Sequence, residues 1–301
     1  MFHHFHDDVY PTSQGSISKE DLISIIEFIN PKNILNADEW IKNFKNNSLS
    51  ENELCITFDH GLKCQFDIAL PVLKSYGITA FWFVYSSPIE IQKDTLEVYR
   101  HFRMTEFNEI DDFYNFFFDE LKKSKFSDKI KQGLNNFDSS SFLSNLSFYT
   151  YNDRKFRYIR DVILTEEEYF CLMDCIIESY GWNVKEITKE LFITNNDLLT
   201  LKESNHVIGL HSYFHPTVIS KLSYQSQKDE YIKNKTHLEK IVGKITTMSH
   251  PSNAYNDDTL TTLKELGIET GFIADMSSFK SNLEIPRQDH TNIMKMIQET
   301  L

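Results

Sequence analysis

The sequence predicts an α/β barrel of parallel strands, eight-stranded or slightly irregular, with a large helical insertion. Two observations predict this fold class. Buried-strand patterns alternate with amphipathic-helix patterns in the first and last thirds of the chain, and the alternation stops between about residues 90 and 195. The length of 301 residues would also suit two ordinary domains. The β/α order on both sides of the insertion favours a single barrel domain over residues 1–301.

The N-terminal segment is compatible with a short strand over residues 1–10, followed by a loop. Ser18 and Asp21 then have the spacing of a capping box, in which two side chains satisfy the first backbone N–H groups of a helix. A helix is therefore expected after Ser18, with Leu22, Ile25, Ile26 and Ile29 on its apolar face.

A βαβ unit follows. Leu54 to Phe58 has the pattern of a buried strand, and Phe66 to Tyr76 has the pattern of a helix. Gly77 stands where a helix commonly ends in the left-handed conformation. The aromatic and β-branched run from Ile78 to Tyr85 is typical of a second buried strand. A strand, a helix and a strand at this spacing predict two parallel strands.

The α/β alternation resumes after the insertion. The expected elements are a helix capped by Asn195 or Asn196, a strand Val207–Leu210, a helix Ser223–Val242, a strand Thr246–Met248, a helix Asp257–Leu266 closed by Gly267, and a strand Gly271–Ala274.

The insertion has a different periodicity. Aromatic and aliphatic residues recur at helical spacing from Glu106 to Lys123, and the pattern is helical again from Glu166 to Tyr180. Such stripes are much more often core than the lining of a pocket. The insertion is therefore expected to be a mostly helical layer outside the barrel.

Composition restricts the function. The formal net charge of −13 argues against a nucleic acid or an anionic membrane surface as the main partner. The most apolar run, Ile78 to Tyr85, is too short to span a bilayer. A cytoplasmic protein is expected, and its four cysteines would then be reduced. Cys171 and Cys175 share a helix face and could bind a metal, but their apolar neighbours favour buried thiols.

Polar side chains follow two of the predicted strands. Asp59 and His60 end one strand, and His211 and His215 follow another. Because the carboxyl ends of parallel strands share one end of a barrel, these four side chains should meet there. Three neutral imidazoles with one open position form a known catalytic zinc site. The carboxylate could be a ligand or a general base.

These residues resemble the polysaccharide deacetylase family, which is carbohydrate esterase family 4 or the NodB-homology domain. Its first motif, T-F-D-D-G, corresponds to Thr57-Phe-Asp-His-Gly61, and its second, H-[ST]-x-x-H-P, to His211-Ser-Tyr-Phe-His-Pro216. A degraded copy of a third motif is Ser249-His-Pro-Ser-Asn-Ala-Tyr-Asn256. The resemblance covers about residues 1–88 and 195–292. It implies a distorted (β/α)7 TIM-like barrel interrupted by the helical insertion.

The resemblance also implies site roles. Asp59 takes the place of the catalytic base, and His211 and His215 take the places of metal ligands. His60 stands where the family has a metal-binding aspartate, and an imidazole is also a competent ligand for such a metal. The implied cofactor is a divalent metal, most often Zn²⁺, with Co²⁺ or Fe²⁺ as alternatives.

Other family positions are less clear. The third motif lacks the arginine that orients the base, and Arg287 could supply that charge from the last strand end. His290 is the candidate catalytic acid, with a solvated turn residue as the alternative. His3 and His6 could support the site or be surface residues. A backbone N–H of the Ser212–Phe214 loop is expected to stabilise the oxyanion.

The implied function is hydrolysis of an acetyl group from an N-acetylated or O-acetylated sugar, with a surface-glycan precursor favoured. The partner is therefore an acetylated saccharide or sugar conjugate, and an oligomer is possible. Two alternatives remain open. The chain could be a degenerate, non-catalytic sugar-binding protein on the same barrel, or a hydrolase of another non-peptide C–N bond.

Overall fold

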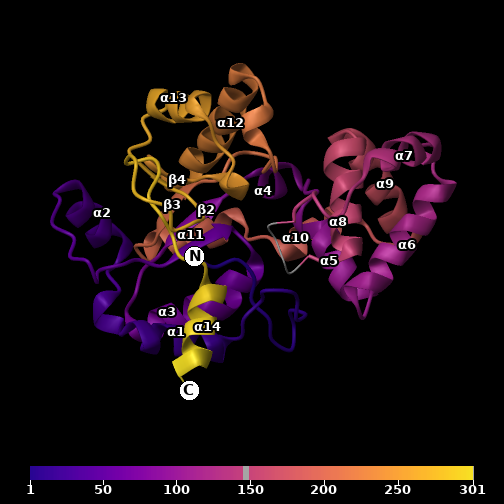
Figure 1. Ribbon diagram of the computed structural model, residues 1–301. Coiled ribbons are helices and arrows are strands. Elements are labelled where there is room, and N and C mark those ends of the chain that lie inside the picture. The colour runs from indigo at the N-terminus through magenta and orange to yellow at the C-terminus, as the bar shows by residue number, and fades with distance from the viewer. Residues whose placement is uncertain (145–148, 301) are drawn as a thin grey trace. The chain divides into compact units, whose positions relative to one another are not determined.

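The computed structural model describes residues 1–144 and 149–300. The chain divides into two compact units (Figure 1). The barrel unit comprises residues 1–94 and 188–300, and the helical unit comprises Thr95–Ile187. No residue described within the helical unit belongs to a strand.

A parallel sheet forms the centre of the barrel unit. Its strands are neighbours in chain order: β1 (Thr57–His60), β2 (Phe81–Val84), β3 (Val207–Leu210), β4 (Thr247–Ser249) and β5 (Thr270–Phe272). Phe2 forms a parallel bridge to Phe58 at one edge, and Ile285 forms one to Phe272 at the other. The described residues thus form a five-stranded parallel sheet with one further parallel bridge at each edge, so the predicted parallel α/β barrel is confirmed.

Strand β2 shows why these segments are strands. Its residues are all buried, and successive side chains point to opposite faces. Phe81 and Phe83 pack with Phe272 in one apolar cluster, whereas Trp82 and Val84 belong to the large cluster beneath the helices. A strand that is apolar on both faces is typical of a parallel sheet covered on both sides.

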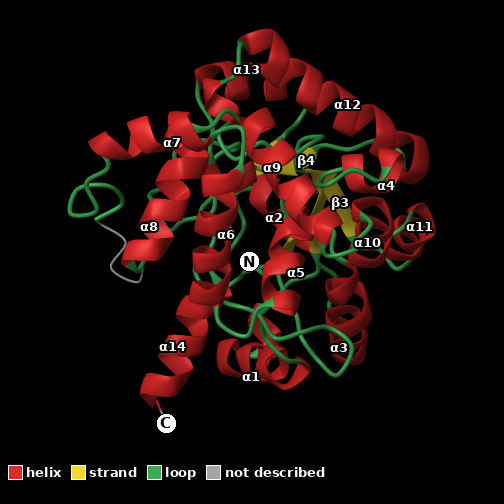
Figure 2. Ribbon diagram, turned by 90° about the vertical axis from the view of Figure 1, so that its right-hand side faces the viewer, coloured by secondary structure: helices red, strands yellow, loops and turns green. Residues whose placement is uncertain are grey.

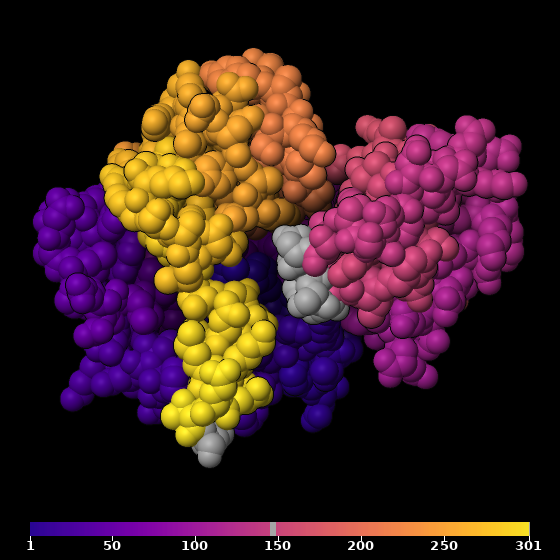
Figure 3. All heavy atoms as spheres, viewed as in Figure 1, coloured from indigo at the N-terminus to yellow at the C-terminus, as the bar shows by residue number. Residues whose placement is uncertain are grey.

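Within the barrel unit, helices surround the sheet (Figure 2). Those of the barrel unit are α1 (Lys19–Ile29), α2 (Ala37–Lys45), α3 (Leu70–Tyr76), α4 (Ser87–Ile91), α11 (Asn195–Glu203), α12 (Tyr224–Val242), α13 (Asp257–Glu265) and α14 (His290–Thr300). The longest, α12, has 19 residues, and no helix in the described part of the chain is both long and apolar enough to cross a membrane. Figure 3 shows α14 on the surface of the barrel unit.

The helix ends follow local sequence signals. The predicted capping box of Ser18 and Asp21 is present, and Gly77 ends α3 in the left-handed conformation with φ 67°. The cap predicted at Asn195 or Asn196 is wrong. Thr194 is the N-cap of α11, because its hydroxyl accepts the N–H of Asp197 and the Asp197 carboxylate returns to the Thr194 N–H.

The helical unit contains α5 (Glu97–Glu106), α6 (Ile110–Lys123), α7 (Ser127–Gly133), α8 (Tyr151–Tyr158) and α9 (Glu166–Ser179), and α10 (Val184–Leu191) leads out of it. The aromatic stripe of α6 forms core, as predicted. The Phe117 ring lies 5.0 Å from that of Phe156, and Phe113 lies 5.7 Å from the same ring. Tyr114 and Leu121 are also buried.

The prediction of buried thiols in this unit is wrong. Cys171 and Cys175 are both exposed. The buried stripe of α9 contains Leu172, Met173 and Ile176, so residues 171 and 175 fall on the flank of the helix that faces solvent. Apolar sequence neighbours therefore did not indicate the face on which the two thiols lie.

Gly209 in β3 provides a test of this sheet. A methyl group there would lie 2.6 Å from the Phe83 ring and 2.7 Å from the Thr247 hydroxyl. Gly209→Ala should therefore lower the free energy of unfolding by about 1–3 kcal/mol, the usual cost of overpacking. Chemical denaturation measures the loss. Adding Phe83→Leu should recover part of it, whereas additive losses in the double variant would contradict the contact.

Candidate metal and catalytic site

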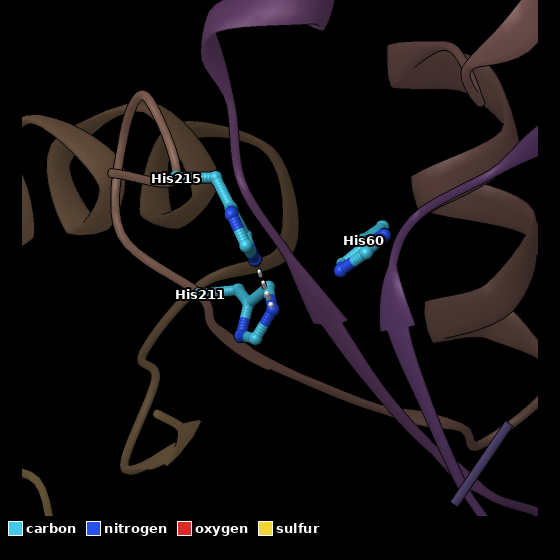
Figure 4. Close-up of side chains that lie close together, drawn as sticks. All are labelled: His60, His211 and His215. Atoms are coloured by element: carbon cyan, nitrogen blue, oxygen red, sulfur yellow. Dashed lines mark hydrogen bonds between the residues drawn. The ribbon is translucent and has the colours of Figure 1, made fainter. Parts of the chain in front are cut away.

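Three histidines converge at the carboxyl ends of the strands. His60 is the last residue of β1, His211 directly follows β3, and His215 lies in the loop beyond it. Their ligand nitrogens all lie within 4.8 Å of one another, and the Nε2 atoms of His211 and His215 are 3.2 Å apart (Figure 4). All three histidines are buried. This three-histidine cluster unites the residues that the sequence selected as metal ligands.

The backbone is strained at and beside the three histidines. His60 has φ 82°, Ser212 has φ 60° and His215 has φ 55°, values that side chains with a Cβ rarely adopt. Gly61 also has a positive φ, and a Cβ there would lie 3.0 Å from Val84. Such conformations cost energy and persist where the surrounding structure holds them, which is common at functional sites.

The imidazole of His211 is held in one orientation. Its Nδ1–H donates to the Ser249 carbonyl at 2.9 Å, so Nε2 carries the lone pair that faces the cluster. Burial, above other causes, lowers the pKa of His211 to about 3, so the ring is neutral near pH 7. A neutral imidazole whose other nitrogen donates to a backbone carbonyl is the usual state of a metal-binding histidine.

Asn234 of α12 connects the strand ends beside the cluster. Its Oδ1 accepts the His211 N–H at 3.0 Å, and its Nδ2 donates to the Val84 carbonyl at 2.9 Å and to the Ser86 hydroxyl at 2.5 Å. Asn234 therefore joins the ends of β2 and β3. Sequence reasoning missed this residue, although a fully buried amide on a core-facing helix needs such partners.

Asp59 forms a buried ion pair with Arg287. Two guanidinium nitrogens each donate to one carboxylate oxygen at 2.7 Å, and both side chains are 3% exposed. Arg287 also donates to the Thr57 hydroxyl and the Ile273 carbonyl. Burial alone would raise the pKa of Asp59, but the charge and hydrogen bonds of Arg287, with the nearby His211, hold that pKa well below its ordinary range.

Ser249 of β4 links this ion pair to the histidines. Its hydroxyl accepts from Arg287 at 2.7 Å and donates to Asp59 at 3.2 Å, while its carbonyl orients His211. One residue therefore contacts the candidate base, the arginine and a candidate ligand. Ser249 is the first residue of the degraded third motif, so the motif marks this position even though it lacks an arginine.

His3 adjoins both groups. Its Nε2 lies 3.8 Å from the Asp59 carboxylate, and its ring centre lies 5.0 Å from that of His60. Gln65 donates to the carbonyls of His3 and Asp59 at 2.6 and 2.7 Å and thereby fixes the two segments together. The His3 side chain is 24% exposed, so solvent reaches it. His6 instead contacts the Ser16 hydroxyl.

The structure does not bring His290 to the cluster. Its ring nitrogens face the carbonyls of Met1 and Gly15 at 3.2 and 2.9 Å, and its ring stacks on Phe2 with the centres 5.5 Å apart. With both nitrogens engaged by backbone, this position gives no support to the predicted role of His290 as catalytic acid.

Two backbone N–H groups of the Ser212–Phe214 loop, where an oxyanion donor is expected, already have a partner. The N–H groups of Tyr213 and Phe214 donate to the Glu230 carboxylate, at 3.0 and 2.8 Å. The expectation of an oxyanion donor from this loop stays a prediction.

The residues present fit a divalent metal. The cluster offers three imidazole nitrogen donors, and imidazole suits zinc, cobalt and iron. Asp59 is committed to Arg287 through both oxygens, which favours a base beside the metal over a ligand to it. The cluster could therefore hold one metal ion through His60, His211 and His215.

One protein family matches part of the sequence. A sequence model of the polysaccharide deacetylase family matches residues 170–271. This segment contains His211, His215 and the third motif, and it leaves out Asp59, His60 and Arg287. No curated protein matches the chain.

Solved structures share the fold over nearly the whole chain. IcaB from Ammonifex degensii has a TM-score of 0.58 at 11% identity, covering 98% of this chain and 93% of its own. The Streptococcus pyogenes deacetylase PplD in complex with acetate has 0.55 at 14%, covering 98% and 95%. A de-N-acetylase from Aggregatibacter actinomycetemcomitans has 0.55 at 13%, covering 98% and 97%. The matched segment and the shared fold confirm the resemblance of this chain to the polysaccharide deacetylase family.

Proposed function

We propose that this protein is a metal-dependent hydrolase that removes an acetyl group from an N-acetylated or O-acetylated sugar. The observation that carries the proposal is the three-histidine cluster beside the Asp59–Arg287 pair. A metal site, a carboxylate and a partly exposed imidazole then lie at one end of the barrel, where enzymes of this architecture react.

The proposed steps use residues that are already in place. A bound divalent metal supplies Lewis-acid activation of water and of the acetyl carbonyl. Asp59 accepts the proton of the attacking water, while Arg287 and Ser249 hold the carboxylate in position. The charge and hydrogen bonds of Arg287 keep Asp59 ionised, so its carboxylate is in the form that can accept a proton near pH 7.

His3 replaces His290 as the proposed proton donor to the leaving group. His3 lies beside Asp59 and His60 and is partly exposed, whereas both nitrogens of His290 face backbone carbonyls. An imidazole within reach of the base can take up the proton that the base removes and deliver it to the departing nitrogen or oxygen.

The substrate class rests on the family resemblance and on charge. The similar structures include a deacetylase in complex with acetate and a de-N-acetylase. The net charge of −13 favours a neutral saccharide over a nucleic acid. We place the reaction in the cytoplasm and favour a glycan precursor as the substrate.

His60 supports a second candidate. The family has an aspartate at this position, and a changed ligand would be expected in a barrel that binds sugar without hydrolysing it. The convergence of His60 with His211 and His215 favours the enzyme. Acetate release from a panel of acetylated sugars distinguishes the two candidates.

The metal proposal predicts the effect of His211→Ala. Loss of a ligand whose orientation Ser249 fixes should remove most of the metal that the wild-type protein binds. Metal content after dialysis, measured by mass spectrometry, checks the result. His6→Ala is the matched control and should bind as much metal as wild type, because His6 contacts Ser16. Equal metal in wild type and His211→Ala would exclude this cluster.

The base proposal predicts the effect of Asp59→Asn. The amide keeps the size of the side chain but cannot take a proton, so kcat should fall by about 10²–10⁴ while metal content stays the same. Steady-state acetate release and metal analysis on one preparation measure both. Loss of metal together with activity would make Asp59 a ligand, and unchanged activity would remove it from the mechanism.

The ion pair predicts a pH-dependent stability. Arg287→Met leaves a buried carboxylate without its partner and should cost about 3–5 kcal/mol at pH 7. The folded-state pKa of Asp59 lies below the ordinary 3.8, so the pair stabilises the fold above that pH and loses its contribution as pH falls through the folded-state value. Denaturation of both proteins from pH 7 to 3 should therefore show the stability gap narrowing at acid pH.

The control for this measurement is Lys122→Met, which removes a surface pair with Asp119 and should change stability little at any pH. An Arg287→Met variant as stable as wild type at pH 7 would contradict the buried pair.

A further inference from the structure

The helical unit contains a pocket that the proposed function does not use. It has a volume of about 230 Å³ and is lined mainly by residues of α6, α7, α8 and the π-helix Ile159–Ile163. Its apolar lining is formed by Phe118, Leu121, Ile130, Leu134 and Ile159. Its polar lining is formed by Ser127, Lys122, Lys131 and Lys155.

The charge of this lining is one-sided. Three lysines line the pocket and no carboxylate does, in a chain whose net charge is −13. Lys122 pairs with Asp119 outside the pocket. Within the described residues, Lys131 and Lys155 have no carboxylate within ion-pair distance. An anion in the pocket would therefore find two ammonium groups, those of Lys131 and Lys155, that no described carboxylate neutralises.

The surroundings of Lys155 disfavour the charged form of its side chain. Its Nζ lies 4.3 Å from the centre of the Phe118 ring, over an apolar surface. Burial, followed by the charge of Lys122, lowers the pKa of Lys155. A negative group at the rim of the pocket would raise the pKa of Lys155, because it would stabilise the ammonium form and offset the repulsion from Lys122.

We propose that this pocket binds a small amphiphile with one apolar chain and an anionic head, either a carboxylate or a phosphate. The apolar floor takes the chain, and the three lysines take the head. Ligand sites commonly combine an apolar lining with a few polar groups that fix orientation, and ammonium groups bind both kinds of anion. The site lies in its own compact unit, so the proposal does not depend on the three-histidine cluster.

Titration calorimetry of the full chain tests the ligand class. Decanoate and decyl phosphate, below the concentrations at which they aggregate, should each bind once per chain. Octanoate should bind about tenfold more weakly than decanoate, because two fewer methylene groups are buried. The relative affinities of decanoate and decyl phosphate identify the preferred head. Decanol should bind more weakly than either anion.

Variants locate the site. Lys155→Gln removes the most buried ammonium and should weaken decanoate about three- to tenfold, whereas decanol binding should not change. Leu134→Trp should fill the pocket and abolish binding of both probes. Lys129→Gln is the matched control on α7, since Lys129 pairs with Glu168 and does not line the pocket. Its decanoate affinity should equal that of wild type.

Four results would overturn the proposal. The first is no binding of either anion, and the second is decanol binding as tightly as decanoate. The third is unchanged decanoate affinity in Lys155→Gln, which stays informative even if Leu134→Trp fails to fold. Association with anionic phospholipid vesicles, without binding of the monomeric probes, would also overturn it and would indicate a membrane-binding surface instead.

Discussion

The buried ion pair of Asp59 and Arg287 is the interaction on which the rest of the site depends. It joins β1, the first strand of the sheet, to the segment that follows the Ile285 bridge beside β5, so it connects the two ends of the five-stranded sheet. Because both groups are buried, neither can lose its partner without leaving an uncompensated charge. The pair therefore fixes the position of the carboxylate that we propose as base.

One neighbouring residue, Ser249, connects this ion pair to the histidines. Ser249 contacts both members of the pair through its hydroxyl and orients His211 through its carbonyl. Asn234 holds the backbone of His211 from the helix side. The candidate base and the candidate ligand His211 are therefore positioned by one hydrogen-bond network.

The sequence could predict the parts of this site that depend on local pattern and strand direction. Parallel strands bring their carboxyl ends together, and for that reason Asp59, His60 and His211 could be assigned to one site. Partners that come from distant segments carried little local signal. Asn234 resembles any polar residue of an amphipathic helix, and the role of Glu230 appears only when α12 packs beside the loop after β3. The faces of Cys171 and Cys175 were misjudged for the same reason, since burial depends on which flank of α9 meets its neighbours.

The central claim is that three imidazoles hold one metal while Asp59 stays paired with Arg287. X-ray absorption spectroscopy of the cobalt-loaded or zinc-loaded protein tests it most directly, because multiple scattering counts the imidazole ligands. The account predicts three imidazoles in the first coordination shell, from His60, His211 and His215, and no contribution from the Asp59 carboxylate. A shell of two imidazoles with a protein carboxylate would contradict the account, because His60 would then lie outside the metal site.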